Sequence, residues 1–101
     1  MYAAKVIGTV VSTQKDPRMN GLKLHVVQPV NIITFENEGK PAVAIDAVGA
    51  GNSEIVLVVS GSSARLTDIT LNKPVDATIM AIIDYVDIEG KNVFSKSKKE
   101  T

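Results

Sequence analysis

The sequence contains few side chains that could perform chemistry, and they are spread along the chain. His25 is the only histidine. As a general base it would need a nucleophile or a carboxylate beside it, and no local motif supplies one. Its position on the same predicted face as Lys23 is typical of a solvated or interface residue. Because a catalytic zinc site usually needs three protein ligands rich in nitrogen or sulfur, and the chain has no cysteine, we predict no metal and no cofactor.

Four aspartates remain as candidates for acid–base work, but the sequence does not bring any two of them together. Asp46 is the most notable, because it lies on the predicted outward face of an apolar strand, three residues before a glycine loop. We interpret it as a carboxylate that accepts backbone N–H bonds or faces a neighbouring subunit. A small enzyme that uses Asp46, His25 or Arg65 is kept as an alternative. The other three carboxylates are Asp76, Asp84 and Asp87.

Two short motifs resemble ligand-binding loops. Gly49-Ala50-Gly51 resembles the start of a dinucleotide-binding loop, but Asn-Ser-Glu and a strand follow where that fold requires a helix and a third glycine. We therefore interpret it as a tight turn where backbones approach closely. Ser62, Ser63 and Arg65 could present donors to an anion at a helix N-terminus. A serine cap and an arginine that pairs with a neighbour are the commoner uses of these residues.

The composition points to a single domain that associates with other chains. We place the domain at residues 1–95, followed by a polar tail at residues 96–101. Of all residues 45% are hydrophobic and 22% charged. A domain of this size has too little interior to bury so many apolar side chains, so another chain should cover part of its surface. We therefore expect a homo-oligomer.

The charge balance argues against two other classes of protein. The 11 basic and 11 acidic residues cancel, whereas nucleic-acid binders usually carry a basic patch. The aromatic residues are also too few and too scattered for a base-stacking surface. A single-stranded nucleic-acid-binding protein is kept only as an alternative. No apolar run approaches the roughly 18 residues of a membrane span. We predict a cytoplasmic protein with neither nucleic acid nor a membrane as partner.

The pattern of β-branched residues and turns predicts a small all-β protein. The expected architecture is an OB-like β-barrel of five to six strands with one short helical turn, which we place at residues 61–66. The alternation predicts Leu22, Leu24 and Val26 on an inner face with His25 opposite them. In the next strand it predicts Val43 and Ile45 inward, and Ala42, Ala44 and Asp46 outward. The strands are expected at residues 3–13, 22–28, 42–48, 55–59, 76–88 and 93–95.

Several short motifs occur in a fixed order over about residues 1–88. They are KVIGTVVSTQK at 5–15, GLK at 21–23 with Gln28, DAVGAG at 46–51, EIVLV at 54–58, GSSAR at 61–65, KPVDA at 73–77 and AIID at 81–84. None is diagnostic alone, but the ordered set resembles the EutN/CcmL family of bacterial microcompartment vertex proteins.

The resemblance implies a structural function and no enzymatic one. It implies an OB-like barrel that assembles into a ring, with a pentamer as the favoured homo-oligomer. Such rings cap the vertices of polyhedral shells in the cytoplasm, where flat hexagonal tiles alone cannot close. Hexameric microcompartment shell proteins are therefore the implied partners.

The resemblance also implies roles for individual residues. Gly49, Ala50 and Gly51 are expected near the ring axis, where small residues let several copies converge. Asp46, Ser62, Ser63 and Arg65 are expected at subunit interfaces, with Arg65 as a bidentate partner for a neighbouring carboxylate or carbonyl. Asp16, Pro17, Arg18 and Asn20 are expected to contact neighbouring shell tiles.

Overall fold

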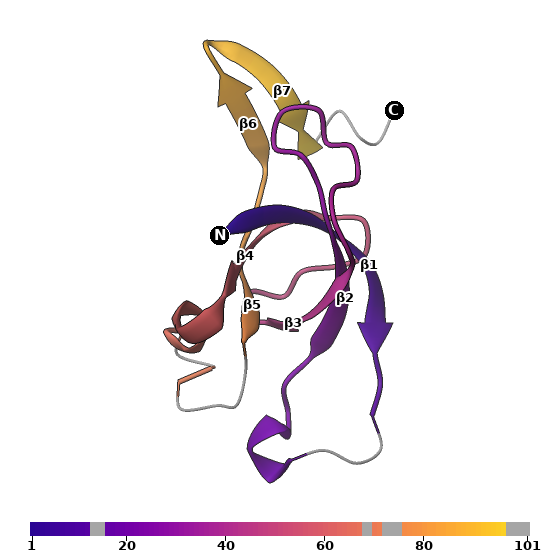
Figure 1. Cartoon of the computed structure of the whole chain (residues 1–101), viewed down its shortest axis with the longest axis vertical. Coiled ribbons are helices and arrows are strands. Elements are labelled where there is room, and N and C mark those ends of the chain that lie inside the picture. The colour runs from indigo at the N-terminus through magenta and orange to yellow at the C-terminus, as the bar shows by residue number, and fades with distance from the viewer. Residues whose placement is uncertain (13–15, 68–69, 72–75, 97–101) are drawn as a thin grey trace.

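The computed structural model describes residues 1–12, 16–67, 70–71 and 76–96. Within these ranges the chain forms seven β-strands and two short 3-10 helices (Figure 1). None of the helices described is long and apolar enough to cross a membrane. The strands are β1 (Tyr2–Val10), β2 (Leu24–Pro29), β3 (Ala42–Asp46), β4 (Ile55–Ser60), β5 (Ala77–Ile82), β6 (Tyr85–Ile88) and β7 (Lys91–Ser95), and the 3-10 helices are η1 (Pro17–Met19) and η2 (Gly61–Arg65).

Five of the strands close into a barrel in the order β1-β2-β3-β5-β4. Neighbouring strands are antiparallel except for β3 and β5, which run parallel. The prediction of an all-β barrel with a short helical turn after the fourth strand is therefore confirmed. β1 carries a bulge between Val6 and Gly8, and a bulge beside a glycine lets a strand bend around a barrel. The predicted strand end at Thr13 lies outside the described residues.

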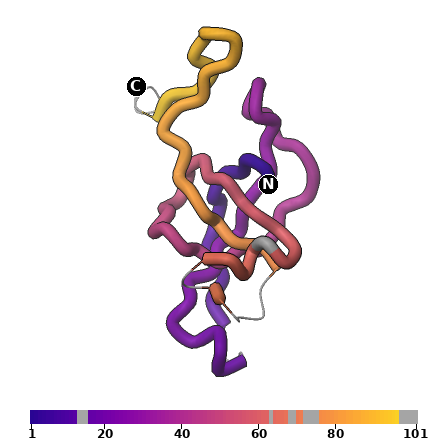
Figure 2. The backbone as a smooth tube through the Cα atoms, turned by 90° about the vertical axis from the view of Figure 1, so that its left-hand side faces the viewer, coloured from indigo at the N-terminus to yellow at the C-terminus, as the bar shows by residue number. Residues whose placement is uncertain are grey.

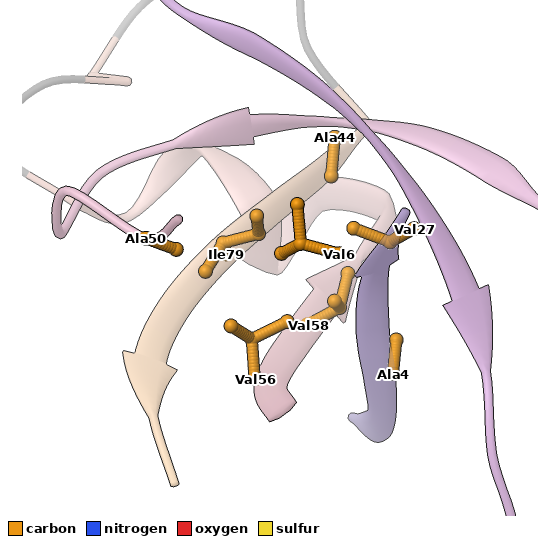
Figure 3. Close-up of a cluster of buried hydrophobic side chains, with 8 residues drawn as sticks. All are labelled: Ala4, Val6, Val27, Ala44, Ala50, Val56, Val58 and Ile79. Carbon is orange, nitrogen blue, oxygen red and sulfur yellow. The ribbon is translucent and has the colours of Figure 1, made fainter. Parts of the chain in front are cut away.

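The interior of the barrel is filled by small aliphatic side chains (Figure 3). One cluster, drawn from all five barrel strands and from one loop residue, comprises Ala4, Val6, Val27, Ala44, Ala50, Val56, Val58 and Ile79. Alanine and valine suit the narrow space inside five strands, because larger side chains would not fit around the axis. A second cluster of Ile45, Val59 and Ala64 packs η2 onto the outside of the barrel wall. Because of this second cluster β4 is buried on both faces, as its continuous apolar run predicts.

The inner and outer faces of β2 are the reverse of the prediction. His25 and Val27 are buried, whereas Val26 is only partly covered on the outside. The prediction that Leu22, Leu24 and Val26 face inward is therefore wrong. Leu22 and Leu24 pack against the second cluster instead. Alternation is an unreliable guide in this strand because its outer face is also partly covered.

The faces of β3 are reversed in the same way. Ala44 belongs to the interior cluster, and Asp46 is buried beside it in the strand. Val43, which was predicted to point inward, is 48% exposed. Ile45 is buried as predicted, but in the cluster beneath η2. Ala44 fits the crowded interior better than a larger valine, which explains why the more hydrophobic side chain lies outside.

The predicted strand at residues 76–88 forms two strands, β5 and β6. β5 closes the barrel, whereas β6 pairs with β7 in a separate two-stranded sheet. This hairpin stands at one end of the barrel, beside the loop at residues 31–40, in both views (Figures 1 and 2). The rings of Phe35 in that loop and Phe94 in β7 stack with centroids 5.0 Å apart. The predicted domain limit at residue 95 stays a prediction, and residues 97–101 lie outside the described part.

Candidate functional site: a buried His–Asp pair, the loop it holds, and two barrel faces

Asp46 and His25 form a polar pair in the otherwise apolar barrel. His25 Nε2 lies 3.0 Å from Asp46 Oδ2, and the two side chains are only 4% and 2% exposed. The prediction that both face outward is therefore wrong, and His25 does have the carboxylate partner that its local sequence did not reveal. The register places them together, because His25 in β2 lies opposite Ala44 in β3, two residues before Asp46.

The other oxygen of Asp46 holds the turn that follows β3. Oδ1 accepts hydrogen bonds from the amides of Val48, at 2.9 Å, and Gly49, at 2.8 Å. Burial alone would raise the pKa of Asp46, but bonds from the amides of Val48, Ala50 and Gly49 and from His25 hold it below its ordinary value. The interpretation of Asp46 as an acceptor of backbone N–H bonds is therefore confirmed. Its carboxylate is used within its own subunit.

The three predicted axis residues differ in their surroundings. Gly49 has a φ of 78° in open space, a backbone conformation that favours glycine. Gly51 is exposed, and its amide donates to Glu54 Oε1. Ala50 lies between them but is only 4% exposed, because its methyl group packs into the barrel interior near Ile79 (Figure 3). The side chain of Ala50 therefore faces its own core, and of the three residues only the flanking glycines are exposed.

The far side of this loop is held by a second carboxylate. Glu54 accepts from the Gly51 amide and pairs with Lys96. The Lys96 ammonium, followed by the Gly51 amide, holds the pKa of Glu54 below its ordinary value. Lys96 was predicted to begin the polar tail, and the structure shows that it is tied to the base of the loop. Asp46 and Glu54 thus fix the loop from both ends.

Two of the predicted interface residues in η2 lie on the surface. Ser62 and Arg65 are exposed, whereas Ala64 between them is fully buried. The hydroxyl of Thr78 in β5 donates to the carbonyl of Ala64, which holds η2 against the barrel. Ser63 belongs to the same 3-10 helix. The apolar side chain of Leu66, directly after η2, is largely exposed.

The predicted tile-contact residues form a self-contained turn around η1. Asp16 accepts from the amide and the guanidinium of Arg18, and Pro17 is the first residue of η1. The hydrogen bonds from Arg18 lower the pKa of Asp16 to about 2. Asn20 follows η1 and is exposed. All four residues are thus accessible, at the opposite end of the molecule from the β6–β7 hairpin (Figure 1).

Sequence reasoning missed an apolar stripe on the outer wall of the barrel, made of Ile7, Val26 and Val43. Val26 lies directly opposite Val43 in β3 and opposite Gly8 in β1, next to the bulge that contains Ile7. The stripe thus crosses β1, β2 and β3. Ile7 is 50% exposed and Val43 nearly as much. The only signal in the sequence was the excess of apolar residues, which predicts that such a surface exists but not where.

The arrangement does not resemble a catalytic or nucleic-acid site. A cavity of about 360 Å³ at the base of the hairpin is lined by Lys5, Glu54, Phe94 and their neighbours, and neither His25 nor Asp46 is part of its lining. Among the described residues no group of three or more potential metal ligands comes together. Phe35 and Phe94 stack on each other, so their faces are not both free to stack on bases.

Comparisons with known proteins agree with this architecture. The family model described as "Ethanolamine utilisation protein EutN/carboxysome" matches residues 1–84. The carboxysome shell vertex protein CcmL of Synechococcus elongatus is 46% identical over 101 residues, which cover 95% of this chain and 96% of that protein. The structure of Gloeobacter violaceus CcmL superposes with a TM-score of 0.90 at 39% identity, covering 96% of this chain and 99% of that chain.

A second similar solved structure is that of a pentameric shell protein. The GrpN pentameric microcompartment shell protein from Rhodospirillum rubrum matches with a TM-score of 0.75 and 44% identity, over 87% of this chain and 98% of that chain. The match of the family model over most of the chain, together with relatives of this identity and coverage, shows that the chain belongs to the EutN/CcmL family of microcompartment shell vertex proteins.

Proposed function

We propose that this chain is a structural subunit of a bacterial microcompartment shell, where it forms a pentameric ring that caps a vertex. The shell lies in the cytoplasm. Family membership and the pentameric relative support this function. The structural observation that carries it is the apolar stripe of Ile7, Val26 and Val43, which a lone barrel leaves in contact with water.

A closed ring needs two different surfaces on each subunit, because each copy contacts its two neighbours head to tail. In the barrel order, the stripe crosses β1, β2 and β3, whereas η2 packs on β4 and β5 and over Ile45 of β3, so the two surfaces are different. We infer that the stripe of one copy packs against the η2 side of the next. Exposed groups on the η2 side are Ser62, Arg65, Leu66 and, on β5, Met80.

The remaining site residues fit into this ring as follows. Gly49 and Gly51 lie nearest the ring axis, with Ala50 anchoring the loop between them from inside the barrel. Asp46 contributes to the interface through the loop that it holds, since its own oxygens are occupied. Asp16, Pro17, Arg18 and Asn20 face hexameric shell tiles. Ser63 is assigned to the interface with its neighbours in η2.

The ring subunit has no enzymatic role and binds no nucleic acid. A buried His–Asp pair needs a nucleophile or a substrate within reach, and the described cavity at the hairpin does not open onto it. The balanced charge gives no counterion-driven attraction to phosphates. Hexameric shell proteins are therefore the partners that the ring requires, in addition to its own copies.

The interface is tested by placing a charge in the stripe. Val43→Lys should leave the barrel folded, because Val43 is 48% exposed in the single chain, but should prevent ring formation, because assembly would bury the ammonium without a partner. Ile33→Lys, which changes an exposed apolar residue in the loop at residues 31–34, is the matched control. Analytical ultracentrifugation should show rings for the wild type and Ile33→Lys and folded monomers for Val43→Lys. Wild-type assembly of Val43→Lys at equal concentration would contradict this interface.

A further inference from the structure

His25 is buried with one ring nitrogen satisfied and the other unpartnered. Nε2 lies 3.0 Å from Asp46 Oδ2, whereas buried Nδ1 has no hydrogen-bond partner within the described residues. Since the ionised carboxylate can only accept, Nε2 must carry a proton. Burying a polar atom without a hydrogen-bond partner costs free energy, and most buried polar atoms in proteins have a partner. The unpaired Nδ1 therefore suggests that the hydrogen bond of Nε2 has a structural role.

We propose that His25 is a positioning residue that sets the shape of the loop at residues 47–51 through Asp46. By donating to Oδ2, His25 turns the carboxylate so that Oδ1 points at the amides of Val48 and Gly49. Each oxygen then has its own donors. Without His25, a buried oxygen would lack a donor, and the carboxylate would turn to share the two amides between both oxygens.

Besides its bonds to Asp46, the first half of the loop is held by the hydrogen bond that the Ala47 amide donates to the Ile79 carbonyl, at 3.3 Å. The amides of Val48 and Gly49, which donate hydrogen bonds to Asp46 Oδ1, lie immediately before Ala50, whose methyl group packs in the barrel core. The turn between them includes the positive φ of Gly49. The second half of the loop is held separately, by Glu54 at the Gly51 amide. The hydrogen bond of His25 therefore acts on residues 47–49 more than on residues 51–54.

The consequence for the axis rests on the proposed function. If Gly49 and Gly51 face the ring axis, His25 controls the geometry of the axial opening from within the barrel, without touching it. The local effect on the loop is independent of that placement, since all the contacts involved lie within one subunit.

Hydrogen exchange on the assembled protein tests the proposal with two variants. His25→Leu keeps an apolar side chain of similar size but removes the donor, and His25→Gln restores a donor at nearly the place of Nε2. Amide exchange at Val48 and Gly49 should be faster in His25→Leu by roughly tenfold, and return toward the wild-type rate in His25→Gln. The amides of Val56 and Val58 in β4 serve as the control for global opening and should change less in both variants.

The outcomes separate this inference from the proposed function. Unchanged exchange at Val48 and Gly49 in His25→Leu, or equal acceleration in both variants, would overturn the positioning role even if native mass spectrometry still shows the ring. Nitrogen-15 NMR of the wild-type imidazole gives a second test that needs no variant. It should show the proton on Nε2, and a proton on Nδ1 with none on Nε2 would refute the assignment.

Discussion

At the residue scale, two carboxylates hold one loop from its two ends. Asp46 accepts from a buried histidine and from two backbone amides, and Glu54 accepts from a third amide and a lysine. Side-chain carboxylates are the natural means to hold a turn whose amides have no strand partner. Asp46, Glu54 and His25 thus fix the conformation of this loop.

Replacing Asp46 by alanine should destabilise the barrel. The change leaves the amides of Val48 and Gly49 and the Nε2 proton of His25 without acceptors inside the protein, so we expect a loss of about 3 kcal/mol in the free energy of unfolding. Urea denaturation at one fixed protein concentration measures it. Asp84→Ala, at an exposed aspartate, is the control and should change the free energy by no more than about 0.5 kcal/mol. Equal losses in the two variants would refute the assigned role of Asp46.

The same pair of proteins yields a pH prediction. The pKa of Asp46 is lowered from an ordinary value of 3.8. The folded state therefore gains from the ionised form above pH 3.8, and this gain is lost as the pH falls through the lower pKa of the folded protein. The difference in unfolding free energy between the wild type and Asp46→Ala should shrink as the pH falls below about 4. A difference that grows on acidification would contradict the prediction.

Ala50 and Gly51 are adjacent, but a bulky side chain should destabilise the protein at Ala50 and not at Gly51. Ala50→Trp must force an indole into the filled barrel core, which should cost about 3 kcal/mol or more and reduce the yield of folded protein. Gly51→Trp should fold normally, since a Cβ there would meet only the end of the Glu54 side chain, at 3.4 Å. Thermal unfolding distinguishes them. A stable Ala50→Trp protein would show that the alanine does not anchor the loop.

At the element scale, the five barrel strands could be predicted from the sequence, but their faces could not, nor could the division of the run at residues 76–88 into β5 and β6. β1 and β4 are recognisable from β-branched runs, and the turns from glycine and proline. In β2 and β3 the apolar alternation is misleading, because Val26 and Val43 lie on the outer stripe while His25 and Asp46 lie inside. A sequence pattern cannot distinguish an inner face from an outer face that another copy covers. The His–Asp contact depends on β2–β3 register, which is also invisible in the sequence.

The β6–β7 hairpin shows a second limit of the same kind. The break between β5 and β6 occurs within a run of β-branched residues, so nothing in the composition marks it. An isolated two-stranded sheet is only marginally stable in water, and here the stacking of Phe94 on Phe35 joins it to the loop at residues 31–40. The position of this element thus depends on a contact between residues far apart in the chain.

This contact can be measured by a double-mutant cycle. Phe35→Leu and Phe94→Leu should each destabilise the protein, and the double variant should lose less than their sum. The coupling expected for a stacked pair is about 0.5–1.5 kcal/mol. Urea denaturation of the four proteins at equal concentration provides the values. Strictly additive losses would show that the stacking does not hold the hairpin.

At the scale of the whole molecule, a barrel with two unlike exposed faces is suited to closed assembly. The stripe of Ile7, Val26 and Val43 crosses β1, β2 and β3, whereas η2 packs over β3, β4 and β5. Because the two surfaces differ, one copy can contact the next head to tail until the ring closes. The excess of apolar residues in the sequence predicts such a surface. The position of this surface and the inward placement of Ala50 can be seen only in the folded structure.

The measurement that tests the central claim most directly is the mass of the assembled wild-type protein. Native mass spectrometry at micromolar concentration should show one dominant species of five copies of the 10.7 kDa chain. A stable monomer under these conditions, or a closed ring with a different number of copies, would contradict the assignment of this chain as the five-fold vertex of a shell.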